Sequence, residues 1–430
     1  MPPVKSRQRE LGLYFRGHES NKAGSYFTGD GIVDRSEITN RRKFLAGLAG
    51  AAGAASLMSG VRVSAAAGKN RAIPQQIKMF NIDLNWSGAT FPAPGYWADV
   101  SPEDHVNWCA DLGANVIHSY TVSCNGYAWY KGGIAPAQPG LKHDYFREVQ
   151  RLAHKRNMLV TGYYCVGANT LWGEDHPDLS YGTPVSAHIP LTDVYLDYLC
   201  ASIADGMKQT GMEVCTLDWI WNPGGQGAVF TPSGEPHDKA WIDAEKKLFT
   251  QLTGLRFPAT GMPVGEDKLA YERLAIERTW QRILETRDTT DRNCLLALWM
   301  NHPDRPSIQG SKIFGEVDWY INENPKPDRL ELARGKVRKG ARLIQNLSGW
   351  ANHDAKAYLA DPQYARFDMS AFAEPRENGL LPPVAEYLSK PVDSFKGKEN
   401  DRIAANDYNI AALARFFRGL PMDTVIPPKA

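Results

Sequence analysis

The 430-residue sequence predicts an α/β fold, a (β/α)8 TIM barrel with insertions after strand 4 and near the C-terminus. From about residue 77 onward, short apolar stretches alternate with longer helical stretches. The short stretches are apolar throughout, which is typical of parallel strands that are buried on both faces. No glycine-rich phosphate-binding fingerprint accompanies them, so a closed barrel is favoured over a doubly wound sheet.

Eight stretches are expected to form the strands, and the eighth has the weakest pattern. In chain order they are Lys78 to Trp86, Ala114 to Thr121, Met158 to Cys165, Cys215 to Trp221, Cys294 to Asn301, Val317 to Asn324, Ala341 to Trp350 and Ala365 to Phe372. The fourth should point Val214, Thr216 and Asp218 to one face, because alternate side chains of a strand share a face.

Helices are expected between these strands, and local signals mark several of their ends. Ser101 followed by Pro102 is typical of a helix start, and Gly211 is a natural residue just beyond a helix end. The expected helices are Ser101 to Leu112, Asp144 to Asn157, Val194 to Gly211 and Asp407 to Leu420. Two stretches are expected to be insertions: Pro223 to about Leu269, and Asp354 onward.

The composition is that of a folded globular protein, with 43% hydrophobic and 23% charged residues. Lys and Arg number 49 and Asp and Glu number 48, so no basic surplus favours binding to nucleic acid. The chain also carries 12 Trp and 18 Tyr. Aromatic faces stack on sugar rings, so these residues point weakly toward carbohydrate; packing in a large aromatic core is the alternative.

The N-terminal region matches a bacterial twin-arginine export signal, and an anchored or buried helix is the alternative. Arg41 and Arg42 precede an Ala/Gly-rich apolar stretch that reaches Met58 and is followed by small residues at 64–67. We therefore expect residues 1–67 to be the n-region and signal peptide, and residues 68–430 to be the barrel domain. The twin-arginine translocation machinery would be a partner, and the mature protein would be periplasmic or extracellular without a stable membrane span.

The six cysteines show neither a CxxC pair nor zinc-site spacing, so most are expected to be buried thiols. Cys124 and Cys165 both fall at strand ends and could pair with each other after export.

Polar and aromatic residues gather where the expected strands end, which is the rim where barrel enzymes place their sites. Asp218 is the most informative of them, because an unpartnered carboxylate in an apolar strand is costly to bury. We expect the following residues to bind substrate: Asn85, Trp86, Ser123, Cys124, Asn125, Trp129, Trp219, Trp221, Trp299, Asn301, His302, Asn346 and Trp350. For each Trp taken alone, packing in the core is the alternative.

Missing motifs narrow the chemistry. The ten histidines include no HxH and no HExxH, so no metal is expected, and no GxSxG elbow supports a serine hydrolase. Neither a dinucleotide nor a P-loop fingerprint occurs, and no cofactor is expected. The chemistry that these absences leave is that of carboxylates beside aromatic side chains, which is the pattern of glycoside hydrolysis.

Two carboxylates are assigned to that chemistry. Asp218 is the expected nucleophile, with a structural carboxylate as the alternative. Glu323 is the expected general acid, with a solvated loop charge as the alternative, and Glu374 is its rival for the role. A carbohydrate-binding barrel without catalysis is the competing function. It would need no second carboxylate, whereas a retaining hydrolase needs one about 5–5.5 Å from the first.

Residues 77–222 resemble α-L-fucosidase-like glycoside hydrolases, which are TIM-barrel enzymes. The stretch ANVIHSYTVSCNGYAWY is similar to that family's AKYVVLTAKHHDGFALW, and MEVCTLDWIW is similar to its DGIWFDG strand. The resemblance implies a retaining mechanism with Asp218 as the nucleophile. The family's His-His-Asp is replaced by Ser123, Cys124 and Asn125, and its His-Trp-Gly by Asn85-Trp86-Ser87. Those histidines hold fucose in the family, so fucose specificity does not follow.

Replacing Arg41 and Arg42 together with Lys should leave the precursor in the cytoplasm, because the export route recognises the arginine pair itself. Cell fractionation followed by immunoblotting measures this. Normal export of the doubly substituted protein would show that the segment is not a twin-arginine signal.

Overall fold

The computed structural model describes most of the chain beyond the expected signal segment. The described residues are 72–87, 91–181, 189–220, 229–230, 236–237, 241–350, 353–377, 379–398 and 401–427. The expected export signal at residues 1–67 and the candidate site residue Trp221 lie outside them.

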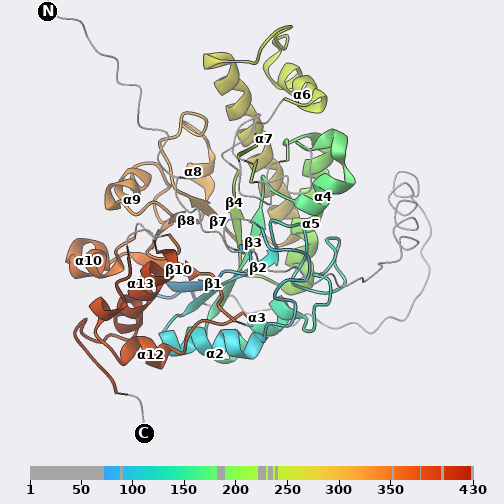
Figure 1. Cartoon of the computed structure of the whole chain (residues 1–430). Coiled ribbons are helices and arrows are strands. Elements are labelled where there is room, and N and C mark those ends of the chain that lie inside the picture. The colour runs from blue at the N-terminus through green and yellow to red at the C-terminus, as the bar shows by residue number, and fades with distance from the viewer. Residues whose placement is uncertain are drawn as a thin grey trace, which may run out of the picture. The chain divides into compact units, whose positions relative to one another are not determined.

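Eight parallel strands close into a barrel, seen at the centre of Figure 1. Around the barrel the order is β1-β10-β9-β8-β7-β4-β3-β2. The strands are β1 (Lys78–Ile82), β2 (Val116–Val122), β3 (Leu159–Cys165), β4 (Val214–Asp218), β7 (Leu295–Met300), β8 (Trp319–Asn322), β9 (Arg342–Asn346) and β10 (Asp368–Ala373). The predicted barrel is therefore confirmed, including the weakly patterned eighth strand.

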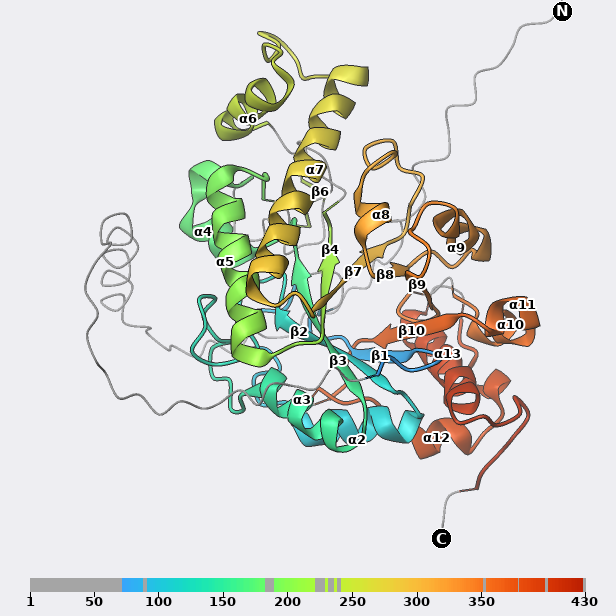
Figure 2. The same ribbon diagram turned by 180° about the vertical axis from the view of Figure 1, so that it is seen from behind.

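Helices surround this barrel on its outer side (Figure 2). They are α2 (Pro102–Leu112), α3 (Tyr145–Lys155), α4 (Thr170–Asp175), α5 (Asp193–Thr210), α6 (Asp243–Thr253), α7 (Gly265–Thr290), α8 (Ile313–Glu316), α9 (Pro327–Arg334), α10 (Ala355–Ala360), α11 (Pro362–Ala365), α12 (Val384–Leu388) and α13 (Arg402–Phe417). Two 3₁₀ turns, η1 (Pro177–Leu179) and η2 (Val392–Phe395), complete the set for the described residues.

The expected helix ends form as the sequence signals indicate. The Ser101 side chain accepts a hydrogen bond from the Asp104 N–H at the start of α2. Gly211 takes a left-handed conformation (φ 65°) just beyond α5, where other residues would be strained.

The two expected insertions differ in character. After β4 the chain forms the short antiparallel pair β5 (Val229–Phe230) and β6 (Pro236–His237), then α6, before the 26-residue α7 leads to β7. From Asp354 onward, α10 and α11 form the connection from β9 to β10, so this part belongs to the regular alternation. The additional structure near the C-terminus is α12, η2 and α13, which pack against one another.

Side chains alternate between the barrel interior and the helix-facing core. Val214 packs inside with Met79 and Val116, whereas Cys215 and Leu217 belong to the larger core that includes helix residues. The face of β4 that carries Val214 therefore points into the barrel, and Asp218 lies at the carboxyl end of that face. All six cysteines are free and buried, so Cys124 and Cys165 are not joined. None of the helices formed by the described residues is long and apolar enough to span a bilayer.

Candidate active site

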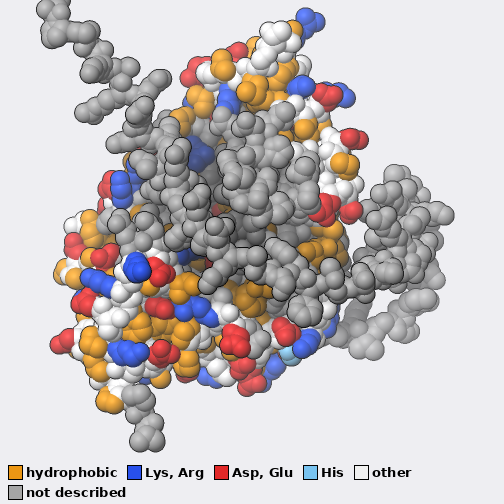
Figure 3. Space-filling model, in the orientation of Figure 1, with side chains coloured by type: hydrophobic (Ala, Val, Ile, Leu, Met, Phe, Trp, Pro, Cys, Tyr) orange, Lys and Arg blue, Asp and Glu red, His pale blue; other side chains and the backbone are white. Residues whose placement is uncertain are grey.

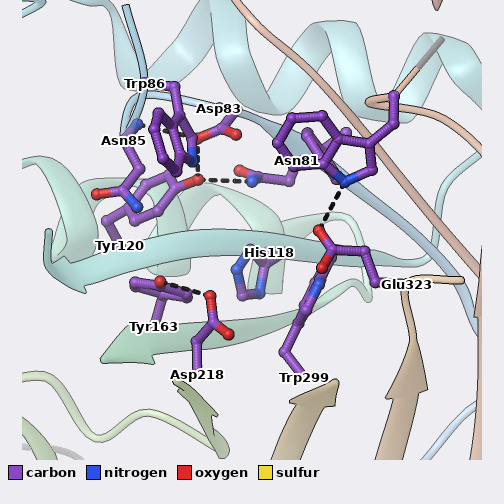
Figure 4. A pocket seen from close by; sticks show the side chains of 12 residues that line it. Asn81, Asp83, Asn85, Trp86, His118, Tyr120, Tyr163, Asp218, Trp299 and Glu323 are labelled. Atoms are coloured by element: carbon purple, nitrogen blue, oxygen red, sulfur yellow. Dashed lines mark hydrogen bonds between the residues drawn. The ribbon is translucent and has the colours of Figure 1, made fainter. Parts of the chain in front are cut away.

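A pocket opens where the barrel strands end (Figure 4). Its residues come from β1, β2, β3, β4, β7, β8, β9 and β10 or directly follow those strands. The lining residues are Asn81, Asp83, Asn85, Trp86, His118, Tyr120, Tyr163, Asp218, Trp299, Glu323, Trp350 and Phe372. The pocket thus combines three carboxyl groups with aromatic walls.

Asp218 is the last residue of β4 and is held through both carboxylate oxygens. Tyr163, on the neighbouring β3, donates its hydroxyl to Oδ2 at 2.8 Å, and the Trp219 N–H donates to Oδ1 at 2.8 Å. Trp219 has a φ of 59°, a left-handed conformation that bulky side chains rarely adopt. The backbone is therefore strained at Trp219, the residue whose N–H donates to the Asp218 side chain.

Glu323 follows the last residue of β8 and is held by the indole of Trp350, which donates its Nε1–H to Oε1 at 2.8 Å. The guanidinium of Arg402 lies over the Trp350 ring, 4.3 Å from its centroid. Arg402 is the first residue of α13 and also donates to the Gly349 carbonyl at 2.8 Å. This hydrogen bond helps to hold the guanidinium over the Trp350 indole.

Burial raises the pKa of both carboxyl groups. At Asp218 the negative charge of Glu323 raises the pKa further, and the hydrogen bonds from Tyr163 and the Trp219 N–H oppose the shift. At Glu323, the indoles of Trp350 and Trp299 and the charge of Arg402 moderate the increase. The charge of Glu323 therefore favours a proton on Asp218, and the charge of Asp83 favours a proton on Glu323.

Asp83 is a third carboxyl group of the pocket, and the sequence analysis missed it. Its side chain is only 4% exposed, and burial raises its pKa. Tyr120 donates its hydroxyl to Asp83 Oδ1, and Asn81 Nδ2 donates to the Tyr120 hydroxyl at 2.7 Å. The signal in the sequence was the same as for Asp218: a carboxylate within an apolar strand, here NIDLNW.

His118 on β2 is the second important residue that the sequence analysis missed. Its Nδ1 lies 2.6 Å from Thr161 Oγ1, and burial lowers its pKa to about 3, so the imidazole is neutral. The sequence signal was an imidazole inside the apolar run ANVIHSYT. Figure 4 shows His118 between the labelled side chains of β1 and those of Asp218 and Glu323.

The structure brings six of the expected site residues into the pocket: Asp218, Glu323, Asn85, Trp86, Trp299 and Trp350. The other described candidates do not line it: Ser123, Cys124, Asn125, Trp129, Trp219, Asn301, His302 and Asn346.

The segment after β2 explains most of the difference. Ser123 accepts the Trp129 indole N–H at 2.6 Å, and Asn125 accepts from Gln138 at 3.3 Å, so these polar groups are satisfied by their own loop. Cys124 supports the pocket indirectly, because its N–H donates to Asn85 Oδ1 at 2.8 Å and its Sγ accepts from Asn85 Nδ2 at 3.0 Å.

The remaining candidates lie elsewhere at the strand ends. Asn346 donates its amide to the Ser348 carbonyl at 2.7 Å and is fully buried. His302 is half-buried, and burial together with Arg305 and Arg329 lowers its pKa. Glu374, the rival acid, pairs with Arg402 at 2.7 Å outside the pocket lining. No cluster of three or more metal-binding side chains occurs among the described residues.

Comparison with solved structures finds similar barrels. An α-L-fucosidase isoenzyme 2 from Paenibacillus thiaminolyticus matches with a TM-score of 0.52 and 14% identity over 78% of this chain and 48% of that one. A Thermotoga maritima α-fucosidase in complex with fucose gives 0.38 and 11%, covering 76% and 58%. An Anoxybacillus α-amylase gives 0.40 and 10%, covering 81% and 79%.

The Paenibacillus match shows a shared fold, and the resemblance expected from the sequence is confirmed at that level. This chain spans about half the length of that enzyme. No protein-family profile matches the chain, and no curated protein matches its sequence.

Replacing Asp218 with Asn should stabilise the protein at pH 8. Because the folded-state pKa of Asp218 is raised, the folded protein binds this proton more tightly than the unfolded chain does. The free energy of unfolding of the wild type therefore falls as pH rises from about 4, the ordinary Asp pKa, to the raised pKa of Asp218. Above the raised pKa, the folded protein carries a buried negative charge. We expect a gain of roughly 1 kcal/mol, or a Tm increase of about 2 °C, that shrinks as pH falls from the raised pKa and is absent below about pH 4.

Thermal melting across pH measures this difference. Asp205→Asn is the matched control, since Asp205 also accepts a tyrosine hydroxyl (from Tyr130, 2.8 Å) but lies on α5 away from the pocket. A lower Tm for Asp218→Asn at pH 8, with Asp205→Asn unchanged, would make Asp218 a structural carboxylate.

Proposed function

We propose that this chain is an exported glycoside hydrolase that cleaves a glycan or glycoside by a retaining mechanism with two carboxylates. One observation carries the proposal: Asp218 and Glu323, from different strands, line one aromatic-walled pocket at the carboxyl ends of the barrel strands. This is the end of the barrel where enzymes of this fold place their sites.

Asp218 acts as the nucleophile in this proposal. Both of its oxygens accept hydrogen bonds, from Tyr163 and from the Trp219 N–H, and these donors stabilise the ionised form. Each oxygen accepts one hydrogen bond and keeps a second lone pair, so Asp218 can attack while both donors hold it in place. One oxygen attacks the anomeric carbon as the bond to the leaving oxygen breaks, which gives a covalent glycosyl ester.

Glu323 acts as the general acid and then as the general base. Its proton passes to the leaving oxygen in the first step, and in the second step Glu323 takes a proton from the water that breaks the ester. Protonated Glu323 also removes the repulsion that raises the pKa of Asp218. The proposed roles require Glu323 to be protonated and Asp218 to be ionised when the first step begins.

Aromatic side chains supply the walls of the sugar site. Trp86, Trp299, Trp350 and Phe372 all line the pocket, and such faces stack on the apolar faces of sugar rings. Three of the four were expected from the sequence. These aromatic residues do not specify which sugar or which linkage is recognised.

A carbohydrate-binding barrel without catalysis is the second candidate. The observation that favours it is the presence of Asn85, Ser123 and Cys124 where the similar fucosidase segments carry histidines. Such a protein would bind a sugar in the same pocket and leave every glycoside intact.

Chemical rescue tests the assigned roles. In a screen of dinitrophenyl glycosides that includes α-L-fucoside, Asp218→Gly should lose turnover by about a thousandfold or more. Added azide should then restore part of it and give a glycosyl azide of inverted configuration. Glu323→Ala should keep more activity on this reactive leaving group, and azide should give the retained configuration, because Asp218 still forms the ester. Product NMR measures both.

Asp205→Asn serves as the control for a lost charge outside the pocket. If azide gave the retained glycosyl azide with Asp218→Gly and the inverted one with Glu323→Ala, Glu323 would be the nucleophile and Asp218 the general acid. Full activity of both variants would refute the two-carboxylate mechanism, and no turnover of any glycoside by the wild type would favour the binding protein.

A further inference from the structure

One wall of the pocket is made of hydrogen-bond acceptors that no described residue satisfies. Asn81 and Asp83 are two residues apart at the end of β1, so their side chains point to the same side of the chain. Both line the pocket, and both are less than 5% exposed. Figure 4 shows them above Asp218 and Glu323, on the side of the pocket formed by β1.

The protons of this wall can be placed from its hydrogen bonds. Tyr120 has one hydroxyl proton, and it goes to Asp83 Oδ1, which also accepts the Asn85 N–H at 2.9 Å. The Tyr120 oxygen is then free to accept, and Asn81 Nδ2 donates to it at 2.7 Å. When Asp83 is ionised, the opposite amide orientation would place the Asn81 oxygen against an oxygen whose proton is already used, so Asn81 is assigned with its nitrogen facing Tyr120.

Two acceptors remain after this accounting. Asn81 Oδ1 is buried and has no hydrogen-bond partner, and no described residue donates to Asp83 Oδ2. A buried acceptor without a partner is destabilising, so Asn81 Oδ1 calls for a donor that the described part of the chain does not supply, and a bound ligand can supply it. Because the two side chains share one wall, the donors that suit them lie on neighbouring atoms of one ligand.

The charges around the pocket exclude anionic ligands. Asp83, Asp218 and Glu323 are acidic, none of the lining residues is Lys or Arg, and His118 is neutral. The positive charge of Arg402 reaches Asp83 and Glu323, but its guanidinium lies over the Trp350 ring and pairs with Glu374. A carboxylate or sulfate on the ligand would meet three acidic groups, and the described lining residues offer no cation to bind it.

We propose that Asn81 Oδ1 and Asp83 Oδ2 form a two-acceptor recognition wall for adjacent hydroxyl or amino groups of the sugar, which is a neutral or amino sugar and not a uronic or sulfated one. The inference rests on the proposed function in one respect, namely that the pocket holds a sugar. It adds the class of sugar and the residues that select it. Tyr120 is a positioning residue here, since it orients both acceptors and faces the ligand with no free proton of its own.

Binding of free monosaccharides to the full chain tests this independently of hydrolysis. The probes are matched pairs that differ in charge: glucose with glucuronic acid, and galactose with galacturonic acid, alongside glucosamine, galactosamine, mannose, xylose and fucose. Titration followed by ligand NMR should detect at least one neutral or amino sugar. Any matched uronic acid should bind at least about tenfold more weakly. A preference for glucosamine over glucose would identify an ammonium as the donor, and equal binding would identify hydroxyl groups.

Two variants assign the selectivity to the wall. Asp83→Asn and Asn81→Ala should each weaken the sugar that binds best by about tenfold to a hundredfold, because each removes one acceptor for it. Among monodeoxy analogues of that sugar, the wild type should discriminate against the one that lacks the facing donor, and Asp83→Asn should not. Asp205→Asn, whose carboxylate accepts the Tyr130 hydroxyl outside the pocket, should bind like the wild type.

Several results would overturn the inference: uronic acids that bind as well as their neutral partners, unchanged affinity and discrimination in both wall variants, or no binding by any sugar. The wild-type panel decides the first and third even if a variant fails to fold. Selective binding without turnover of any aryl glycoside would refute the proposed hydrolysis and leave this inference intact. Turnover of a uronide would support the proposed hydrolysis and refute this inference.

Discussion

The site depends on the burial of three carboxyl groups, Asp83, Asp218 and Glu323, at one end of the barrel. Acidic groups withdrawn from water repel one another and favour protonated forms, so the arrangement is destabilising unless each carboxyl group has donors. The chain supplies those donors from tyrosine hydroxyls, indoles and backbone N–H groups, not from cations in the pocket lining. The carboxyl groups thus remain available for protons and for sugar donors.

The barrel makes this arrangement possible because its strands are rigid and converge. Asp218 ends β4, Glu323 follows β8 and Asp83 follows β1, so residues far apart in the sequence meet in one pocket. Strain is concentrated at the same place, in the left-handed conformation of Trp219 that directs its N–H onto Asp218. Backbone strain of this kind is common at functional sites.

The strands could be predicted from the sequence because each is a short apolar run. Asp218 could be singled out as a candidate site residue because a carboxylate is unusual in such a run, and the structure places it in the pocket lining. Asp83 and His118 carry the same signal but were passed over in favour of residues beyond the strand ends. Ser123 and Asn125 were expected in the pocket and instead satisfy their own loop. The direction in which a loop turns after its strand depends on tertiary packing, and spacing along the sequence does not reveal it.

The central claim is that Asp218 forms a covalent bond to the sugar. Incubation with the 2-deoxy-2-fluoro dinitrophenyl derivative of the best glycoside should trap that intermediate, because the fluorine slows its hydrolysis more than its formation is slowed by the reactive leaving group. Peptide mapping by mass spectrometry should then place one sugar on the peptide that contains Asp218, with none on Glu323 or Asp83. A label on either of those residues, or turnover without any trapped ester, would contradict the account.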